Sequence, residues 1–188
     1  DIGKGGIWLF AEKTDCLNIN IRTKRMNILL VWKDDYPWDV RVEKICKSLI
    51  NDGHVVHLSC SNMKGDKAED NLEGIIIHRL FHIKNKLLNQ ICSMPAFFNP
   101  VWFYKILQIL KQEKIDLIIV RDIPLSLPVL LSSRIYKIPT CLDMAENYPS
   151  MWREHVNRNG LKILNYFLKN PGIATLIENF TIKRVDHV

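Results

Sequence analysis

The chain has 188 residues and a formal net charge of +6, with 47% hydrophobic and 24% charged residues. This length is sufficient for one α/β domain with a full core but short for two, and the composition excludes a largely disordered or low-complexity chain. Charged residues or prolines interrupt every apolar run before it reaches the roughly 20 residues of a membrane span, so we expect no integral membrane segment.

The first 25 residues show neither a helical nor a strand period. They end in the basic run of residues 22–25, directly before Met26. We interpret residues 1–25 as an N-terminal extension that is a candidate for a non-native segment. Residues 26–188 are then the domain proper, which we expect to be truncated at its C-terminal end.

From Met26 onward, short apolar runs alternate with longer segments of helical spacing. The length and the β-branched content of these runs predict strands buried on both faces, which is typical of a parallel sheet covered by helices. The predicted strands are residues 27–32, 54–60, 74–80, 116–121 and 140–144, and residues 183–188 predict the start of a sixth.

The intervening segments predict helices. Apolar residues recur at helical spacing over 42–50, and residues 51–53 close that helix. Asn99 and Pro100 predict the start of a second helix that runs to about residue 114, and a third covers 125–136. The predicted fold class is therefore α/β: a doubly wound, mainly parallel Rossmann-like sheet with helices on both faces and ligands at the carboxyl ends of its strands.

The loop after the first strand, residues 33–44, contains no glycine. A dinucleotide site needs a G-x-G-x-x-G turn so that backbone amides can approach a pyrophosphate. That turn is missing, and so is a P-loop. We therefore expect neither a nicotinamide or flavin cofactor nor kinase-type nucleotide binding.

The same loop offers carboxylates and an aromatic ring. Asp34 and Asp35 can accept hydrogen bonds from sugar hydroxyls, Trp38 can cover the C–H face of a sugar, and Arg41 follows closely. These four residues are predicted substrate-binding residues. The alternative is structural: Asp39 caps the following helix and Arg41 pairs locally.

Residues 78–114 concentrate the positive charge, with six Lys or Arg against one Glu, a net of +5. They also carry many leucines and aromatic residues. This pairing can serve an anionic membrane surface or a phosphate-bearing partner. The alternative is a core helix with a solvated basic face.

The cysteines and histidines indicate no metal site. The five cysteines include no CxxC pair and no histidine partner at metal-ligand spacing, so neither a disulfide framework nor a zinc site is indicated. The six histidines form no catalytic set. We expect no metal in this domain and a cytoplasmic protein.

Three stretches, by their order and spacing, resemble the N-terminal domain of GT-B glycosyltransferases, especially the retaining family 4 group. They are MNILLVWKDDYPWDVRVEKICKSLINDGHVVHL (26–58), DLIIVRDIPLSLPVLLSSRIYKIPT (116–140) and LDMAENYPSMW (142–152). The resemblance, which extends over 26–188, implies that this domain receives a glycan or lipid-linked acceptor. It also implies that a second, missing C-terminal domain binds a nucleotide-sugar donor, so this domain itself needs no cofactor and does not turn over alone.

The third stretch suggests the catalytic residues. Many relatives read Asp-x-His-Asp-x-Tyr-Pro here, but Ala145 stands at the histidine position, so no histidine role is carried over. The resemblance implies that Glu146 is the catalytic carboxylate and that Asp143 orients it. The alternative is that both residues cap the next helix.

Three further residues complete the predicted substrate site. Asn147 and Tyr148 belong to the same stretch, and Asp122 ends the strand at 116–121. An aspartate at such a strand end can also simply fix the following turn.

These observations favour an enzyme of polysaccharide or glycolipid assembly, peripheral at the inner membrane face, with no nucleic-acid partner. The alternative is a non-catalytic α/β module that recognises a glycan or a partner protein. A response-regulator-like receiver ranks last, because the expected Asp after a third strand and Lys after a fifth are missing.

Overall fold

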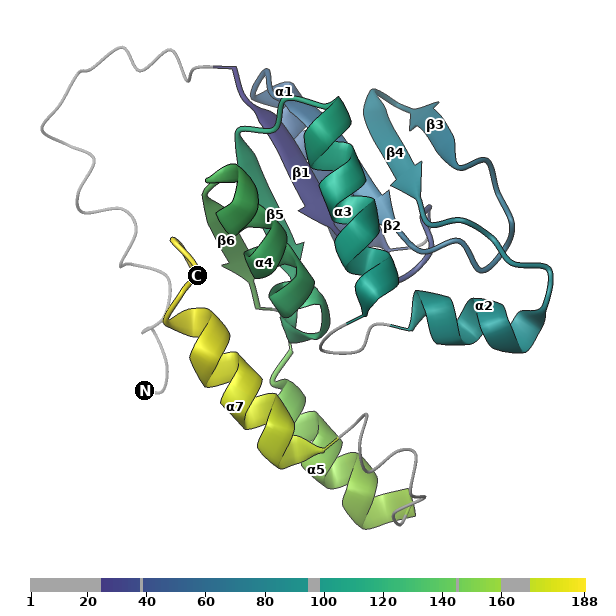
Figure 1. Cartoon of the computed structure of the whole chain (residues 1–188). Coiled ribbons are helices and arrows are strands. Elements are labelled where there is room, and N and C mark those ends of the chain that lie inside the picture. Colours follow the sequence, from purple (N-terminus) through teal and green to yellow (C-terminus); the bar gives the residue numbers. More distant parts are fainter. Residues whose placement is uncertain (1–24, 38, 95–98, 145, 160–169) are drawn as a thin grey trace, which may run out of the picture.

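The computed structural model describes residues 25–37, 39–94, 99–144, 146–159 and 170–188. A six-stranded sheet in the order β3-β4-β2-β1-β5-β6 forms its centre (Figure 1). The strands are β1 (Asn27–Val31), β2 (Val55–Cys60), β3 (Glu69–Leu72), β4 (Ile75–Arg79), β5 (Leu117–Arg121) and β6 (Thr140–Asp143).

Five strands run parallel, as the continuous apolar runs predicted. The central strand β1 pairs Ile28 with Val56 of β2 on one side and with Leu117 of β5 on the other. Its residues from Ile28 to Val31 are fully buried, because helices cover the sheet on both faces. The predicted α/β class and mainly parallel sheet are confirmed.

Two details of the sheet differ from the prediction. The edge strand β3 pairs antiparallel with β4 and was not predicted, because its four residues, EDNL, are all exposed and carry no buried face. The predicted sixth strand at 183–188 is reduced to one parallel bridge between Cys141 and His187. Asp186 turns this segment back onto β6, where its carboxylate accepts a hydrogen bond from Thr140 N at 2.8 Å.

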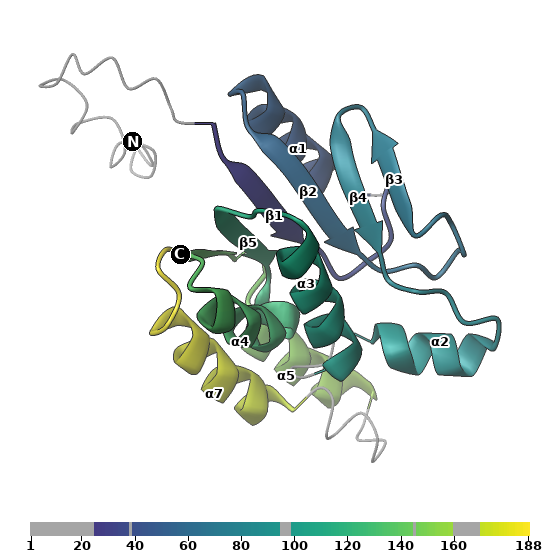
Figure 2. The same cartoon turned by 45° about the horizontal axis from the view of Figure 1, so that its top comes forward.

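The helices form two layers (Figure 1, Figure 2). Helix α1 (Val40–Asn51) packs on one face of the sheet through Val42 and Cys46. Helices α3 (Pro100–Gln112) and α4 (Ser126–Tyr136) cover the other face, with Trp102 and Ile106 of α3 fully buried. For α3, the interpretation as a core helix is therefore confirmed.

Local capping explains where the predicted helices begin and end. Asp39 precedes α1, and its carboxylate accepts hydrogen bonds from Arg41 N at 2.7 Å and Val42 N at 3.3 Å. Gly53 ends the same helix with a φ of +89°, a conformation that glycine adopts at little cost. Asn99 caps α3 ahead of Pro100, as predicted.

The remaining helices lie toward the carboxyl ends of the parallel strands. They are the 3₁₀ turn η1 (Ile123–Leu125), α2 (Lys86–Ser93), α5 (Tyr148–Asn159) and α7 (Pro171–Ile182). Helices α5 and α7 pack together below the sheet in Figure 1. Within the described ranges, no helix combines the length and apolar character that crossing a bilayer requires. Almost all of the predicted extension, residues 1–25, falls outside them.

Candidate functional site

The loops that follow β1, β5 and β6 converge on Tyr148, the first residue of α5. Its hydroxyl is buried and donates a hydrogen bond to Asp122 Oδ2 at 3.3 Å. Burial, followed by the carboxylates of Asp122, Asp34 and Glu146, raises the pKa of Tyr148 well above its ordinary value. The phenol therefore stays protonated at neutral pH, and carboxylates from three separate loops lie in its electrostatic surroundings.

Asp122 is held in an unusual backbone conformation. It has a φ of 66° and a ψ of 165°, a region that residues other than glycine rarely occupy, and such residues cost about 1–3 kcal/mol each. Its N–H donates to Asp143 O at 2.9 Å, which locks the turn against the end of β6. The strained backbone thereby fixes the buried Asp122 carboxylate under the Tyr148 hydroxyl.

Asp143 has a partner that the sequence did not suggest. Its Oδ2 accepts a hydrogen bond at 2.8 Å from Arg121 Nη1, and the Cα atoms of the two residues are paired across β5 and β6. Arg121 is buried, and its guanidinium carbon lies 5.5 Å from the ring centroid of Trp32. Asp143 is thus oriented by Arg121, and only the end position of Arg121 in a buried strand could have signalled this role.

Glu146 lies exposed at the beginning of the segment that enters α5. The next residue, Asn147, precedes the helix, and its Oδ1 accepts a hydrogen bond from Ser150 N at 3.0 Å. Asn147 therefore caps the helix, and the Glu146 carboxylate caps no amide of the described residues. Of the residues predicted from the third stretch, Glu146 is the one most open to a ligand.

The two carboxylates of the first loop, Asp34 and Asp35, have different partners. Asp34 is half-exposed and pairs with Lys33 at 2.6 Å, and Lys33 Nζ lies 4.8 Å from the ring centroid of Trp32. Asp35 accepts hydrogen bonds from Met63 N at 2.9 Å and from Lys64 N at 3.1 Å, and from the hydroxyl of Ser61. These bonds connect the first loop to the loop after β2. The Asp35 carboxylate therefore stabilises the backbone of the loop after β2.

The other two predicted residues of this loop are Trp38 and Arg41. Trp38 lies outside the described residues. Arg41 is exposed on the first turn of α1, where its N–H donates to the capping Asp39. The structural alternative for Asp39 is therefore confirmed.

The carboxyl ends of β1, β5 and β6, with Asp34, Asp122, Asp143, Glu146 and Tyr148, form what we call the rim. Two polar donors near the rim have no hydrogen-bond partner within the described ranges. They are Trp32 Nε1 and Arg121 Nε, both in buried side chains at the ends of β1 and β5. Buried donors of this kind are costly unless water or a ligand satisfies them. The sequence did not identify Trp32 and Arg121 as site residues, because nothing in an apolar strand indicates that its last side chain faces a polar site.

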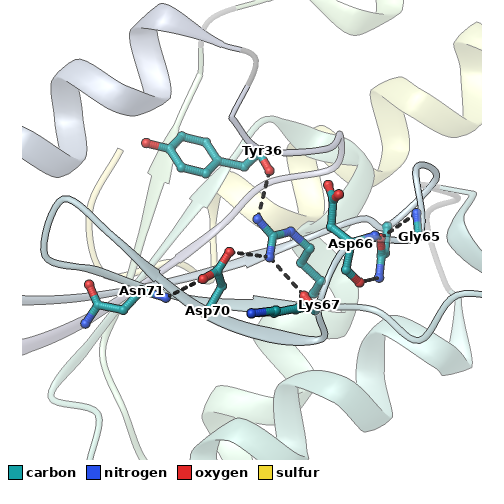
Figure 3. A network of polar contacts seen from close by, with 8 residues as sticks. Tyr36, Gly65, Asp66, Lys67, Asp70 and Asn71 are labelled. Atoms are coloured by element: carbon teal, nitrogen blue, oxygen red, sulfur yellow. Dashed lines mark hydrogen bonds and ion pairs between the residues drawn. The ribbon is translucent and has the colours of Figure 1, made fainter.

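A groove of about 510 Å³ lies away from this rim, between the β3–β4 pair and α3. Arg79 closes one side of it: Nη1 donates to Lys67 O at 2.9 Å and Asp70 Oδ2 at 3.3 Å, and Nη2 to Tyr36 O at 3.2 Å (Figure 3). The groove is lined by Ala68, Glu69, Arg79, Phe81, Val101, Tyr104, Lys105 and Gln108. None of these residues was among the predicted site residues.

Neither side-chain clusters nor sequence comparisons identify the chemistry directly. The described parts of the chain hold no group of three or more His, Cys, Asp or Glu side chains suited to a metal ion. No family model matches the sequence, and a comparison with curated proteins found no match.

The chain is similar to the structure of CalG4, the calicheamicin glycosyltransferase, with a TM-score of 0.50 and 16% sequence identity. The domain has a GT-B glycosyltransferase-like fold. The match covers 84% of this chain but only 45% of CalG4, so this domain spans less than half of the glycosyltransferase it resembles.

Proposed function

We propose that this domain is the acceptor-binding half of a retaining, family 4-like glycosyltransferase. A second Rossmann-like domain would bind the nucleotide sugar, and the acceptor would be a glycan or a lipid-linked sugar of polysaccharide or glycolipid assembly. The GT-B-like fold and its 45% coverage of CalG4 support this proposal. So does the position of the predicted residues, since ligands of open α/β sheets bind outside the carboxyl ends of the strands.

The observation that carries the proposal is the arrangement around Tyr148. The Asp122 carboxylate, after β5, accepts the hydrogen bond of the Tyr148 hydroxyl at 3.3 Å, and Glu146, after β6, lies exposed two residues before Tyr148. Carboxylates accept hydrogen bonds from sugar hydroxyls, and the exposed Glu146 is the one with its oxygens available. In this proposal, Asp122 and Tyr148 form the fixed floor, and Glu146 accepts the hydrogen bond of the attacking acceptor hydroxyl.

The proposed mechanism divides the work between the two domains. The departing nucleoside diphosphate would be stabilised electrostatically by the donor domain, while this domain would fix the acceptor hydroxyl at the reacting carbon. Closure of the two domains would exclude water from the reaction. The ion pair between the buried Arg121 and the partly exposed Asp143 would keep the loop before Glu146 in place during closure.

The test is nucleoside diphosphate release by the full-length protein, supplied with nucleotide sugars and with glycan or lipid-linked acceptors. We expect the Glu146→Gln variant to lose about 10²-fold or more in kcat, the range for a positioned acid or base, with its melting temperature unchanged. Glu113→Gln, at the opposite end of the sheet, is the matched control and keeps full activity. Glycan binding without diphosphate release from any nucleotide sugar would instead favour the non-catalytic binding module.

A further inference from the structure

Helix α2 presents three apolar side chains to solvent and buries two polar ones against the protein. Leu87, Leu88 and Ile91 are 66%, 51% and 52% exposed, whereas Asn89 is 2% and Ser93 5% exposed. An amphipathic helix on a water-facing surface has the opposite arrangement. Among the residues that the structure describes, none covers this apolar face of α2.

Specific hydrogen bonds fix α2 in this orientation. Asn89 Oδ1 accepts from Ile83 N at 3.1 Å, and Asn89 Nδ2 donates to Asn62 O at 3.4 Å. At the other end of the helix, Trp102 Nε1 donates to Ser93 O at 3.1 Å. Rolling the helix to bury its leucines would break these bonds and leave buried polar groups unpaired.

The surroundings of this face are positively charged. Lys84 and Lys86 are exposed at the beginning of α2. The sequence contains no Asp or Glu from Gly74 to Gln112. The thioether of Met63, half-exposed, lies 3.6 Å from Asn89 Nδ2, and Phe81 is exposed just ahead of the helix. Apolar side chains are thus flanked by lysines within a stretch of sequence that itself carries no carboxylate.

We infer that α2 docks this domain onto an anionic lipid surface. Leu87, Leu88 and Ile91 would enter the boundary between head groups and acyl chains, while Lys84 and Lys86 contact the lipid phosphates. A helix with one apolar face and a basic border is the usual form of such an interfacial element. The inference concerns this surface alone and holds whether or not the protein is a transferase.

A second copy of the chain is a less suitable occupant of the same face. Packing α2 against α2 would bring the Lys84 and Lys86 pairs of both copies together without an acidic partner, which electrostatic complementarity disfavours. An anionic bilayer neutralises the same lysines. Charge therefore selects lipid over self-association.

Flotation with lipid vesicles tests the inference on the 188-residue chain. Vesicles of phosphatidylcholine, with or without about one third phosphatidylglycerol, are compared at about 0.05 M and 0.5 M NaCl, which changes screening strongly. We expect binding to the anionic vesicles only, weakened by salt. Leu88→Gln/Ile91→Gln should bind at least about tenfold more weakly, and Lys84→Gln/Lys86→Gln should lose the salt-dependent part.

The matched control replaces exposed apolar residues elsewhere. Ile135→Gln/Leu176→Gln changes side chains that are 60% and 71% exposed on α4 and α7, and this variant should bind like the parent. The inference is overturned if the chain ignores anionic vesicles, or if the α2 and control variants bind equally. It is also overturned if light scattering finds a dimer that the Leu88→Gln/Ile91→Gln variant does not form, because a second copy of the chain then covers this face.

Discussion

His57 and His78 form a buried, stacked pair between the sheet and α3. Their ring centroids are 5.3 Å apart, and His57 Nδ1 lies 3.0 Å from His78 Nε2. His78 Nδ1 is 2.5 Å from a carboxylate oxygen of Glu69, which also pairs with Lys105 of α3 at 3.0 Å. Glu69 therefore links the edge strand β3 both to the histidine pair and to α3.

The histidine pair predicts a pH dependence of stability. Burial lowers the pKa of both rings, and for His57 the neighbouring His78 lowers it further. The unfolded chain therefore binds these protons at higher pH than the folded chain does. The contribution of the pair is fully present above the unfolded pKa of about 6.5, and it is lost as the pH falls below that value.

Urea unfolding at pH 7.5 and pH 5 measures this effect. We expect the free energy of unfolding to fall between the two pH values, and to fall less in His57→Gln. His187→Gln, which changes an exposed ring, serves as the control and should follow the parent. Parallel curves for His57→Gln and the parent would rule out the histidine pair as the source.

Among the elements, α2 and α3 depend on one residue at their junction. Asn99 caps α3 by accepting from Val101 N at 2.9 Å, and its Nδ2 donates to Cys92 O at 2.9 Å and Met94 O at 2.8 Å. The side chain is buried and satisfies carbonyls at the end of α2 as well as an amide of α3. Asp39 performs only the first of these tasks for α1.

This difference predicts unequal costs for two alanine substitutions. Asp39→Ala should lower the free energy of unfolding by about 1 kcal/mol, the usual cost of a lost cap. Asn99→Ala should lower it by about 2 to 3 kcal/mol, because buried carbonyls also lose their donor. Urea unfolding of both variants provides the comparison. Equal losses would show that the bonds to the end of α2 contribute nothing.

The sequence could predict the elements whose buried apolar residues recur at a regular spacing. The apolar runs of β1 and β5 and the spacing of α1 gave their positions to within a few residues. In contrast, β3 is exposed throughout and is defined only by pairing with β4. Helix α2 was not predicted, because its leucines face outward and the spacing of its apolar residues does not follow a buried face.

At the scale of the whole molecule, the parallel sheet determines where the rim forms. Because β1, β5 and β6 run in the same direction, the loops that carry Asp34, Asp122 and Glu146 leave the sheet at the same edge. That convergence could be predicted from strand order alone. The partners of the rim could not, since the ion pair of Arg121 with Asp143 and the use of Asp35 by the loop after β2 depend on side-chain directions.

Protein-observed NMR of the 188-residue chain, titrated with the methyl glycosides of glucose, galactose and mannose, tests whether sugars bind at this rim. For at least one sugar, we predict shifts of amides at 33–34, 122–123 and 143–148 that Glu146→Gln weakens. Shifts confined to the groove between β3–β4 and α3, or no shift at the strand ends with any of the three sugars, would contradict it.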